Sequence, residues 1–484
     1  MPVDAPHVVV IMTDEQKATS LPLYGNPVVQ TPNLARLSAE SVLFDHAYST
    51  CPLCVPTRVS LMTGRHPHTT GSRTNLFLLQ PGERHLMDIF AEHGYRTGLV
   101  GKNHCFVPDD LAKIDYVWEA GHLGPNDPPD EASAAAKRWL RESQVWRKAW
   151  GAVHNPYPPE ALGTTLITDQ AVSFVHRNRE TPFFLWYSIA DPHTPLHAPS
   201  PYKELYEPAA IPLPAWFEDE MQGKPPCQQI DYRALAGDTV TPAVIQEAMA
   251  TYYAMNTYID HEVGRFLSAL DALGLRENTL IIYLSDHGDY LGEHNMIRKS
   301  KALYDCLTHV PLIVSWPGAP TRGTRSDAFV SHEDILPTMM QLLGWAVPDG
   351  VQGRSFAPLL TGEGSYAPRE AIYGEHGIEG EPLEADQVAC FPQSPLSDDF
   401  SPALKRGGRG RCKSVRTKRW KLVHYPGQSY GELYDLEADP WELHNLYGQK
   451  IYDGVVCELS GLLVDWLIDT EDCLPAASDD EMGV

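Results

Sequence analysis

Residues 7–15 read HVVVIMTDE, a short β-branched apolar run that ends in two carboxylates. Such a run is typical of a buried parallel strand with polar groups at its carboxyl end. Residues 279–287, TLIIYLSDH, are a second apolar strand pattern, ending at Asp286 and His287. Because ligands bind outside the carboxyl ends of the strands in open α/β sheets, these two stretches predict a site at the rim of such a sheet.

Strand and helix patterns alternate along most of the chain, which predicts an α/β sandwich with a mostly parallel central sheet. Helices are expected at 31–41, 86–94, 243–273 and 334–343, and further strands at 95–100, 181–190 and 310–316.

The pattern changes after about residue 365. Residues 377–411 are rich in Pro, Gly and Ser and predict a long loop. Short strand patterns and a final amphipathic helix follow, at 413–425, 432–440 and 454–468. We therefore predict two units, a catalytic domain over 1–365 and a small C-terminal α+β subdomain over 366–484.

Composition narrows the classes of partner and compartment. A formal net charge of −25 argues against nucleic acid as a partner. The nine cysteines are odd in number and scattered, unlike the framework of a secreted disulfide scaffold. The apolar run near the N-terminus is too short for a signal sequence or a membrane span. We expect a cytoplasmic protein with no membrane partner.

The acidic strand ends offer metal-ligand chemistry. Asp14 and Glu15 follow one strand, and Asp286 and His287 follow another. Carboxylate oxygens with one imidazole suit a hard divalent cation, Ca²⁺ first and Mn²⁺ where histidine joins. Asp is also a common turn former, so each pair alone is weak evidence, and it is their convergence on one sheet that favours a metal site.

Basic residues stand at the same strand ends. They are Lys102, His104, His193, Lys299 and Lys301. Taken singly, each reads as a surface lysine or a loop histidine. As a set they would form a positive pocket beside the metal in an acidic protein, which predicts a site for a sulfate or phosphate ester.

The nucleophile is sought in residues 51–65, CPLCVPTRVSLMTGR. Cys51 and Cys54 could be a redox pair, but that chemistry calls for a small βαβ domain of its own and leaves Pro56 and Arg58 unexplained. A buried pair of inert thiols is a second alternative.

The stretch Cys54-Val55-Pro56-Thr57-Arg58 resembles the C-x-P-x-R motif of the type I sulfatases, in the alkaline phosphatase superfamily. Further resemblances run in the same order along nearly the whole chain: IMTDEQ, TPNLARLSAES, GKNH, DPHTPLHAP, NTYIDHEVGRFLSALDALGL, TLIIYLSDHGDYLGEH, VPLIVSWPG and GELYDLEADPWELHNL. The resemblance implies an alkaline-phosphatase-like sandwich with a small C-terminal subdomain.

The resemblance also implies a mechanism. A maturation enzyme would oxidise Cys54 to formylglycine, one hydrate oxygen of which attacks sulfur beside the metal. The implied metal ligands are Asp14, Glu15, Cys54, Asp286 and His287. Arg58 and Lys102 would orient the formylglycine, and His104 would be the base that releases sulfate. His193 and Lys299 would bind the sulfate oxygens and assist departure of the alcohol.

Four positions depart from the family pattern or leave it open. Glu15 stands where Asp is more frequent, with Gln16 as the alternative ligand. His287 stands where many sulfatases have Asn, and relatives that act on phosphonate or phosphate esters often have His. Thr57 replaces a frequent Ser, and Lys301 competes with Lys299 for the lysine position.

Three functions follow in order of preference. The first is a sulfatase acting on a small or carbohydrate sulfate ester, favoured by the Lys102-x-His104 pair. The second is a phosphonate monoester or phosphodiester hydrolase on the same scaffold, favoured by His287. The third is a non-catalytic binding protein with unmodified Cys54.

Specificity for the alcohol part of the ester is expected to depend on the loops at 105–165, 195–240 and 377–411. Aromatic residues there, such as Trp216 and Tyr232, either stack on the alcohol or anchor the loops. An oligomer is compatible with all three.

Overall fold

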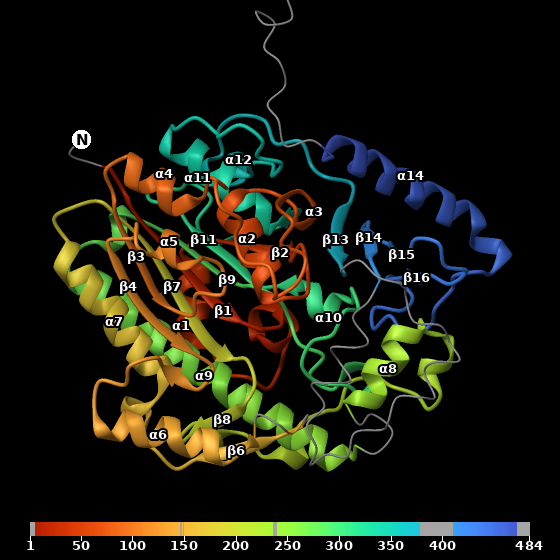
Figure 1. Ribbon diagram of the computed structural model, residues 1–484, viewed down its shortest axis with the longest axis horizontal. Coiled ribbons are helices and arrows are strands. Elements are labelled where there is room, and N and C mark those ends of the chain that lie inside the picture. Colours follow the sequence, from red (N-terminus) through yellow and green to blue (C-terminus); the bar gives the residue numbers. More distant parts are fainter. Residues whose placement is uncertain (1–4, 146–147, 149, 236–239, 378–409, 472–484) are drawn as a thin grey trace, which may run out of the picture.

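The computed structural model describes residues 5–145, 148, 150–235, 240–377 and 410–471. A large mixed sheet lies between two layers of helices, and a smaller sheet with one long helix packs beside it (Figure 1). The strand order of the large sheet is β10-β2-β11-β9-β1-β7-β3-β4-β5, with β12 paired to β2. The predicted α/β class with a mostly parallel central sheet is confirmed.

The strands of the large sheet are β1 (His7–Asp14), β2 (Val42–Tyr48), β3 (Arg96–Gly101), β4 (Tyr116–Gly121), β5 (Gly124–Pro125), β7 (Phe183–Pro192), β9 (Thr279–Ser285), β10 (His309–Val310), β11 (Leu312–Ser315) and β12 (Thr324–Ser331). The main helices are α1 (Pro32–Ala39), α2 (Cys54–Thr63), α4 (Leu86–Glu92), α6 (Glu131–Glu142), α7 (Gly163–Asn178), α8 (Pro226–Ala234), α9 (Pro242–Ala272), α11 (Ile335–Leu343) and α12 (Ala357–Thr361). Shorter elements are α3 (Pro67–Thr70), α5 (Pro108–Leu111), α10 (Asp305–Thr308), η9 (Glu293–Asn295) and the pair β6 (Ala152–Asn155) and β8 (Leu196–Pro199).

Strand β1 shows how the apolar runs build the core. It lies at the centre of the sheet, paired in parallel with β7 on one side and β9 on the other. Val8 and Val10 point to one face, where they join a core with residues of α2, α4 and α11. Val9 and Ile11 point to the other face and pack with residues of α1, α7 and α9. The run is apolar at successive positions because both faces of the strand are covered.

The predicted strand at 310–316 is wrong in detail. It divides into β10 and β11, and both run antiparallel to their partners. Pro311 lies between the two strands, and proline has no N–H to give to a strand ladder.

The C-terminal part forms a four-stranded antiparallel sheet of β13 (Ile372–His376), β14 (Cys412–Arg416), β15 (Trp420–His424) and β16 (Glu432–Asp435). Helix α14 (Asp453–Asp469) packs Leu459, Leu463 and Trp466 against it. The segment predicted as a loop at 377–411 lies almost wholly outside the described residues. The division at 365/366 stays a prediction.

An ion-pair cluster joins the small sheet to the large unit. Glu375 of β13 accepts hydrogen bonds from the backbone N–H and the ring Nδ1 of His68 in α3, at 2.9 and 2.7 Å. Its other carboxylate oxygen pairs with Lys413 Nζ of β14 at 2.5 Å. Burial acts to raise the pKa of Glu375, but Lys413 and His68 outweigh it and hold that pKa below its usual range.

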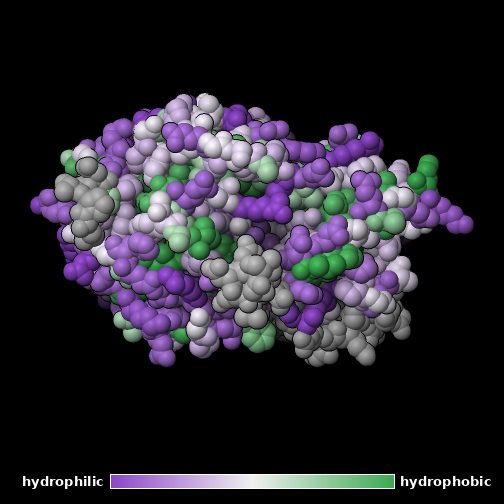
Figure 2. Space-filling view, turned by 90° about the horizontal axis from the view of Figure 1, so that it is seen from above, coloured by the Kyte–Doolittle hydropathy of each residue, from purple (hydrophilic) through white to green (hydrophobic). Residues whose placement is uncertain are grey.

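The face of the molecule seen in Figure 2 is mostly hydrophilic, and hydrophobic side chains appear on it only as small separate patches. Among the described residues, the helices lack the combined length and apolar character that a bilayer span demands.

Candidate active site

Polar side chains from four strands of the large sheet meet at its carboxyl-end rim. Asp14 ends β1, Asp286 and His287 follow β9, Lys102 follows β3, and His193 follows β7. Cys54, the first residue of α2, joins them from outside the sheet. The convergence that the sequence predicts is therefore present.

Four of these residues form a compact group with donor atoms suited to a cation. The ligand atoms of Asp14, Cys54, Asp286 and His287 all lie within 4.8 Å of one another, and all four side chains are buried. Cys54 Sγ lies 3.5 Å from Asp14 Oδ1 and 3.2 Å from His287 Nε2.

The protonation states in this group favour metal binding. His287 Nδ1 lies 2.9 Å from the Gly288 carbonyl oxygen and donates to it, which leaves the Nε2 lone pair directed at the group. Burial acts to raise the pKa of Asp286, but the Arg58 guanidinium and the hydrogen bond from the Glu15 backbone N–H oppose it, and the carboxylate stays ionised. Two carboxylates and a neutral imidazole fit a divalent ion, with position 54 as a fourth ligand.

Cys54 is built into the start of α2 and is 1% exposed. The backbone N–H of Val55 donates to Asn75 Oδ1 at 3.1 Å, which secures this helix end. Burial raises the pKa of the Cys54 thiol to about 12 and raises that of Cys51 well above its usual value. A redox-active cysteine pair needs a thiol with a lowered pKa, so these raised pKa values argue against redox chemistry at Cys51 and Cys54.

Arg58 is fully buried one turn into α2 and holds the site together. Its Nε donates to Asp286 Oδ2 at 2.9 Å, and one terminal nitrogen donates to the Lys102 carbonyl and to Ser188 Oγ, at 3.1 and 2.8 Å. Its other terminal nitrogen lies 3.9 Å from Asp14. The guanidinium thus fixes the positions of the two carboxylates relative to Cys54.

Two lysines add basic groups to the site beside Arg58. Lys102 forms an ion pair with Asp14, and its Nζ lies 3.4 Å from Cys54 Sγ. Lys299 Nζ lies 3.0 Å from Glu15 Oε2. The competing Lys301 is placed elsewhere, since its chief electrostatic neighbours are Asp231 and Cys227.

Glu15 is not a member of the four-residue cation group. Its Oε2 meets His193 Nε2 at 3.2 Å as well as Lys299, and burial raises its pKa to about 8. Its Oε1 is buried without a hydrogen-bond partner. The alternative, Gln16, is engaged by Tyr283 and Asn256. The predicted metal role of Glu15 stays a prediction, and the contacts tie it instead to the predicted sulfate-binding residues.

The structure adds His122, which the sequence analysis did not single out. Its ring stacks on that of His193 with centroids 3.6 Å apart, and lies edge-on to His104 at 5.7 Å. Its Nδ1 is buried without a hydrogen-bond partner, 3.9 Å from Asp14 Oδ2. His122 follows β4, the neighbour of β3, so a histidine directly after that strand was the signal that could have found it.

The fold and this group of side chains are typical of hydrolases of the alkaline-phosphatase-like class, and comparison with known proteins identifies the family. A family profile described as Sulfatase matches residues 6–345, and one described as N-sulphoglucosamine sulphohydrolase, C-terminal, matches 407–467. The chain belongs to the sulfatase family, whose members are sulfuric ester hydrolases.

Similar proteins span nearly the full length of the chain. An arylsulfatase of Clostridium perfringens is 27% identical over 96% of this chain and 95% of its own. A phosphonate monoester hydrolase from Silicibacter pomeroyi has a TM-score of 0.78 and 25% identity, with 96% of each chain covered. A solved structure in complex with its substrate, D-glucosamine-2-N,6-O-disulfate, has a TM-score of 0.73 and 23% identity, covering 97% of this chain and 98% of its own.

Proposed function

We propose that this protein is a formylglycine-dependent sulfatase that hydrolyses a sulfate monoester to sulfate and an alcohol. The observation that carries the proposal is the position of Cys54, within 3.5 Å of Asp14, His287 and Lys102 at the start of a helix. A thiol with a pKa of about 12 is a poor nucleophile there. An aldehyde hydrate at the same position, as the family implies, supplies an oxygen nucleophile without any thiolate.

The chain's own residues then bind and orient an anionic ester. Lys102 and Arg58 hold position 54 against the carboxylates. Lys299 is a donor available to the sulfate oxygens. His193 becomes a second donor only when it is protonated, because its Nδ1 already donates to the Thr194 carbonyl; both side chains contact Glu15 here. His104 is the proposed base, and His122 lies between it and His193.

Asp14, Asp286 and His287 are the proposed ligands of a divalent ion, together with position 54. Such an ion stabilises the negative charge that develops on oxygen during ester cleavage. Ca²⁺ is the first choice because carboxylate oxygens predominate, and Mn²⁺ is the second because His287 contributes nitrogen.

Phosphonate monoester hydrolysis is the second candidate, because His287 is in the cation group and solved phosphonate hydrolases share the fold.

We also propose a cytoplasmic location. The seven cysteines in the described part of the chain are all free, which is consistent with a reducing compartment.

The test combines mass spectrometry with a substrate panel. The peptide holding Cys54 should carry an aldehyde after co-expression with a formylglycine-generating enzyme. The purified protein should turn over aryl or sugar sulfates faster than a phosphonate monoester or a phosphodiester. EDTA should abolish turnover, and Ca²⁺ or Mn²⁺ should restore it. Faster turnover of the phosphorus esters would favour the second candidate, and an unmodified, inactive protein would favour a binding role.

A further inference from the structure

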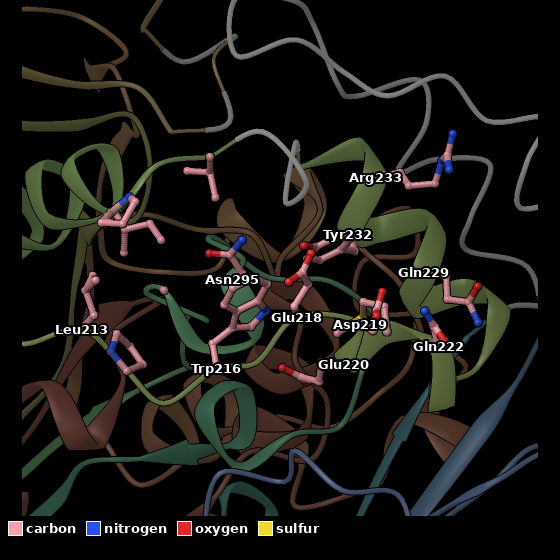
Figure 3. A pocket seen from close by; sticks show the side chains of 16 residues that line it. Leu213, Trp216, Glu218, Asp219, Glu220, Gln222, Gln229, Tyr232, Arg233 and Asn295 are labelled. Atoms are coloured by element: carbon pink, nitrogen blue, oxygen red, sulfur yellow. The ribbon is translucent and has the colours of Figure 1, made fainter.

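A cavity of about 620 Å³ lies apart from the active site, between residues 213–222, α8 and the start of α9 (Figure 3). Its described lining includes none of the active-site residues. Gly292 and Asn295, on the loop that runs from His287 to Lys299, form part of one wall. A concave space of this size is within the range that small-molecule sites occupy.

The cavity combines aromatic surface with negative charge. Trp216, 43% exposed, and Tyr232 supply the aromatic surface, and three consecutive acids, Glu218, Asp219 and Glu220, line the same space. Figure 3 shows Glu218, Tyr232 and Asn295 grouped at the centre of the view with Trp216 below them. Carboxylates beside an exposed indole attract a cation that also has apolar substituents.

Glu220 differs from the other two acids because its carboxylate is buried and one of its oxygens has no hydrogen-bond partner. Its side chain is buried, at 3% residue exposure, and its Oε1 accepts a hydrogen bond from His294 Nδ1 at 2.6 Å. Its Oε2 has no hydrogen-bond partner. A buried carboxylate oxygen without a donor is costly, so a ligand that brings an N–H group into the cavity would relieve that cost.

The basic side chains nearby do not supply the missing hydrogen bond to Glu220 Oε2. Lys224 Nζ lies 3.8 Å from Glu220 Oε1, not its Oε2, and donates to Tyr434 Oη and the Glu442 carbonyl. Arg233 lines the cavity as well, and Figure 3 shows it at the opposite end from Trp216.

We propose that this cavity is a second binding site, for a primary organic ammonium ion. The ammonium group donates to Glu220 Oε2, its charge is balanced by Glu218 and Asp219, and its apolar part contacts Trp216. Leu213 and Ile245 complete the apolar lining.

The test is calorimetric titration of the full-length protein, at constant ionic strength, with butylammonium, tetramethylammonium and 1-butanol. Butylammonium should bind at least about fivefold more tightly than the other two, because only it combines a positive charge with N–H donors. Equal binding of 1-butanol, or failure of butylammonium to bind, would overturn the proposal.

Variants locate the binding. Trp216→Ala, Glu218→Gln and Glu220→Gln should each weaken butylammonium binding by about fivefold or more. Trp441→Ala and Glu437→Gln, exposed residues that do not line the cavity, should leave it unchanged. Glu218 is exposed, so E218Q keeps the test valid if E220Q fails to fold. Unchanged binding in both folded W216A and E218Q would place the ligand elsewhere and overturn the proposal.

Kinetics distinguish the source of the ammonium group. Competitive inhibition of sulfate-ester turnover by butylammonium would show that the ammonium group belongs to the substrate's own alcohol. A different pattern of inhibition, or no inhibition, would show that it belongs to a separate ligand. Binding is measured without turnover, so an inactive Cys54→Ala protein that still binds butylammonium would separate this site from the proposed activity.

Discussion

Cys54 and Cys51 differ in what they touch, although both are buried. Cys54 lies within the cation group, whereas the Cys51 carbonyl accepts hydrogen bonds from Thr57 and Ser49 and serves the turn before α2. We predict that Cys54→Ala lowers turnover of an aryl sulfate by about a thousandfold or more, as loss of a nucleophile does. The matched change Cys51→Ala should retain most of the activity. Equal loss in both variants would revive a role for the pair.

His122 offers a second residue-level prediction. Its unpartnered Nδ1 beside Asp14 and its stacking on His193 place a polar ring next to a residue proposed to bind the ester. We expect His122→Ala to lower kcat by about a hundredfold, and His122→Asn, which can keep a donor near Nδ1, to recover part of it. His154→Ala, which changes an exposed histidine, is the control. Unchanged kcat in H122A would reduce His122 to a packing role.

At the scale of elements, the end of β3 depends on a glycine. Gly101 has φ +107°, and a Cβ built there would lie 1.9 Å from the Ser188 carbonyl oxygen of β7. Lys102 follows directly, and its N–H donates to that same oxygen at 2.8 Å. Gly101→Ala must therefore push β3 from β7 and carry Lys102 away from Cys54.

We predict that Gly101→Ala lowers the free energy of unfolding by about 2 kcal/mol or more and reduces turnover as well. Thermal unfolding and aryl sulfate kinetics on the same preparations measure the two effects. Gly461→Ala, inside α14 with open space around its Cβ position, should be neutral or slightly stabilising. A G101A protein with normal stability and activity would contradict this account of the strand end.

The elements also show how far sequence reasoning reaches. Apolar strands that end in acids, such as β1 and β9, were predictable because composition and strand-end chemistry lie within a few consecutive residues. The antiparallel direction of β11 was not, because direction depends on partners far along the chain. The metal role of Glu15 stays a prediction, and its contact with Lys299 could not be predicted from sequence because the two residues are far apart along the chain. His122 was not predicted because the strand before it, β4, was not predicted either, so its place at a strand end was not recognised.

At the scale of the whole molecule, the ion-pair cluster of Glu375 links the two sheets. Because the pKa of Glu375 is lowered in the folded protein, its stabilisation is fully present above the ordinary value of 4.5 and is lost as pH falls below it. We predict that Glu375→Gln lowers the free energy of unfolding at pH 7 by about 2 kcal/mol, since it leaves the partly buried Lys413 ammonium without its carboxylate partner.

Urea unfolding of wild type and Glu375→Gln from pH 7 downward measures this effect, and the difference should shrink below about pH 4.5. Glu437→Gln, an exposed carboxylate of the same subdomain, should match wild type throughout. A difference that stays constant with pH would show that the Glu375 charge is not the source of the stabilisation.

The position of β1 in the sheet has a consequence for the order of events during synthesis. Strand β1 is synthesised before β7 and β9, which flank it in the sheet, so it cannot be fully paired until β9, which ends at Ser285, has left the ribosome. Until then the nascent chain cannot enclose position 54, which is 1% exposed once folding is complete. Any oxidising catalyst that converts this cysteine must therefore act within that interval, so faster translation or folding would lower the converted fraction.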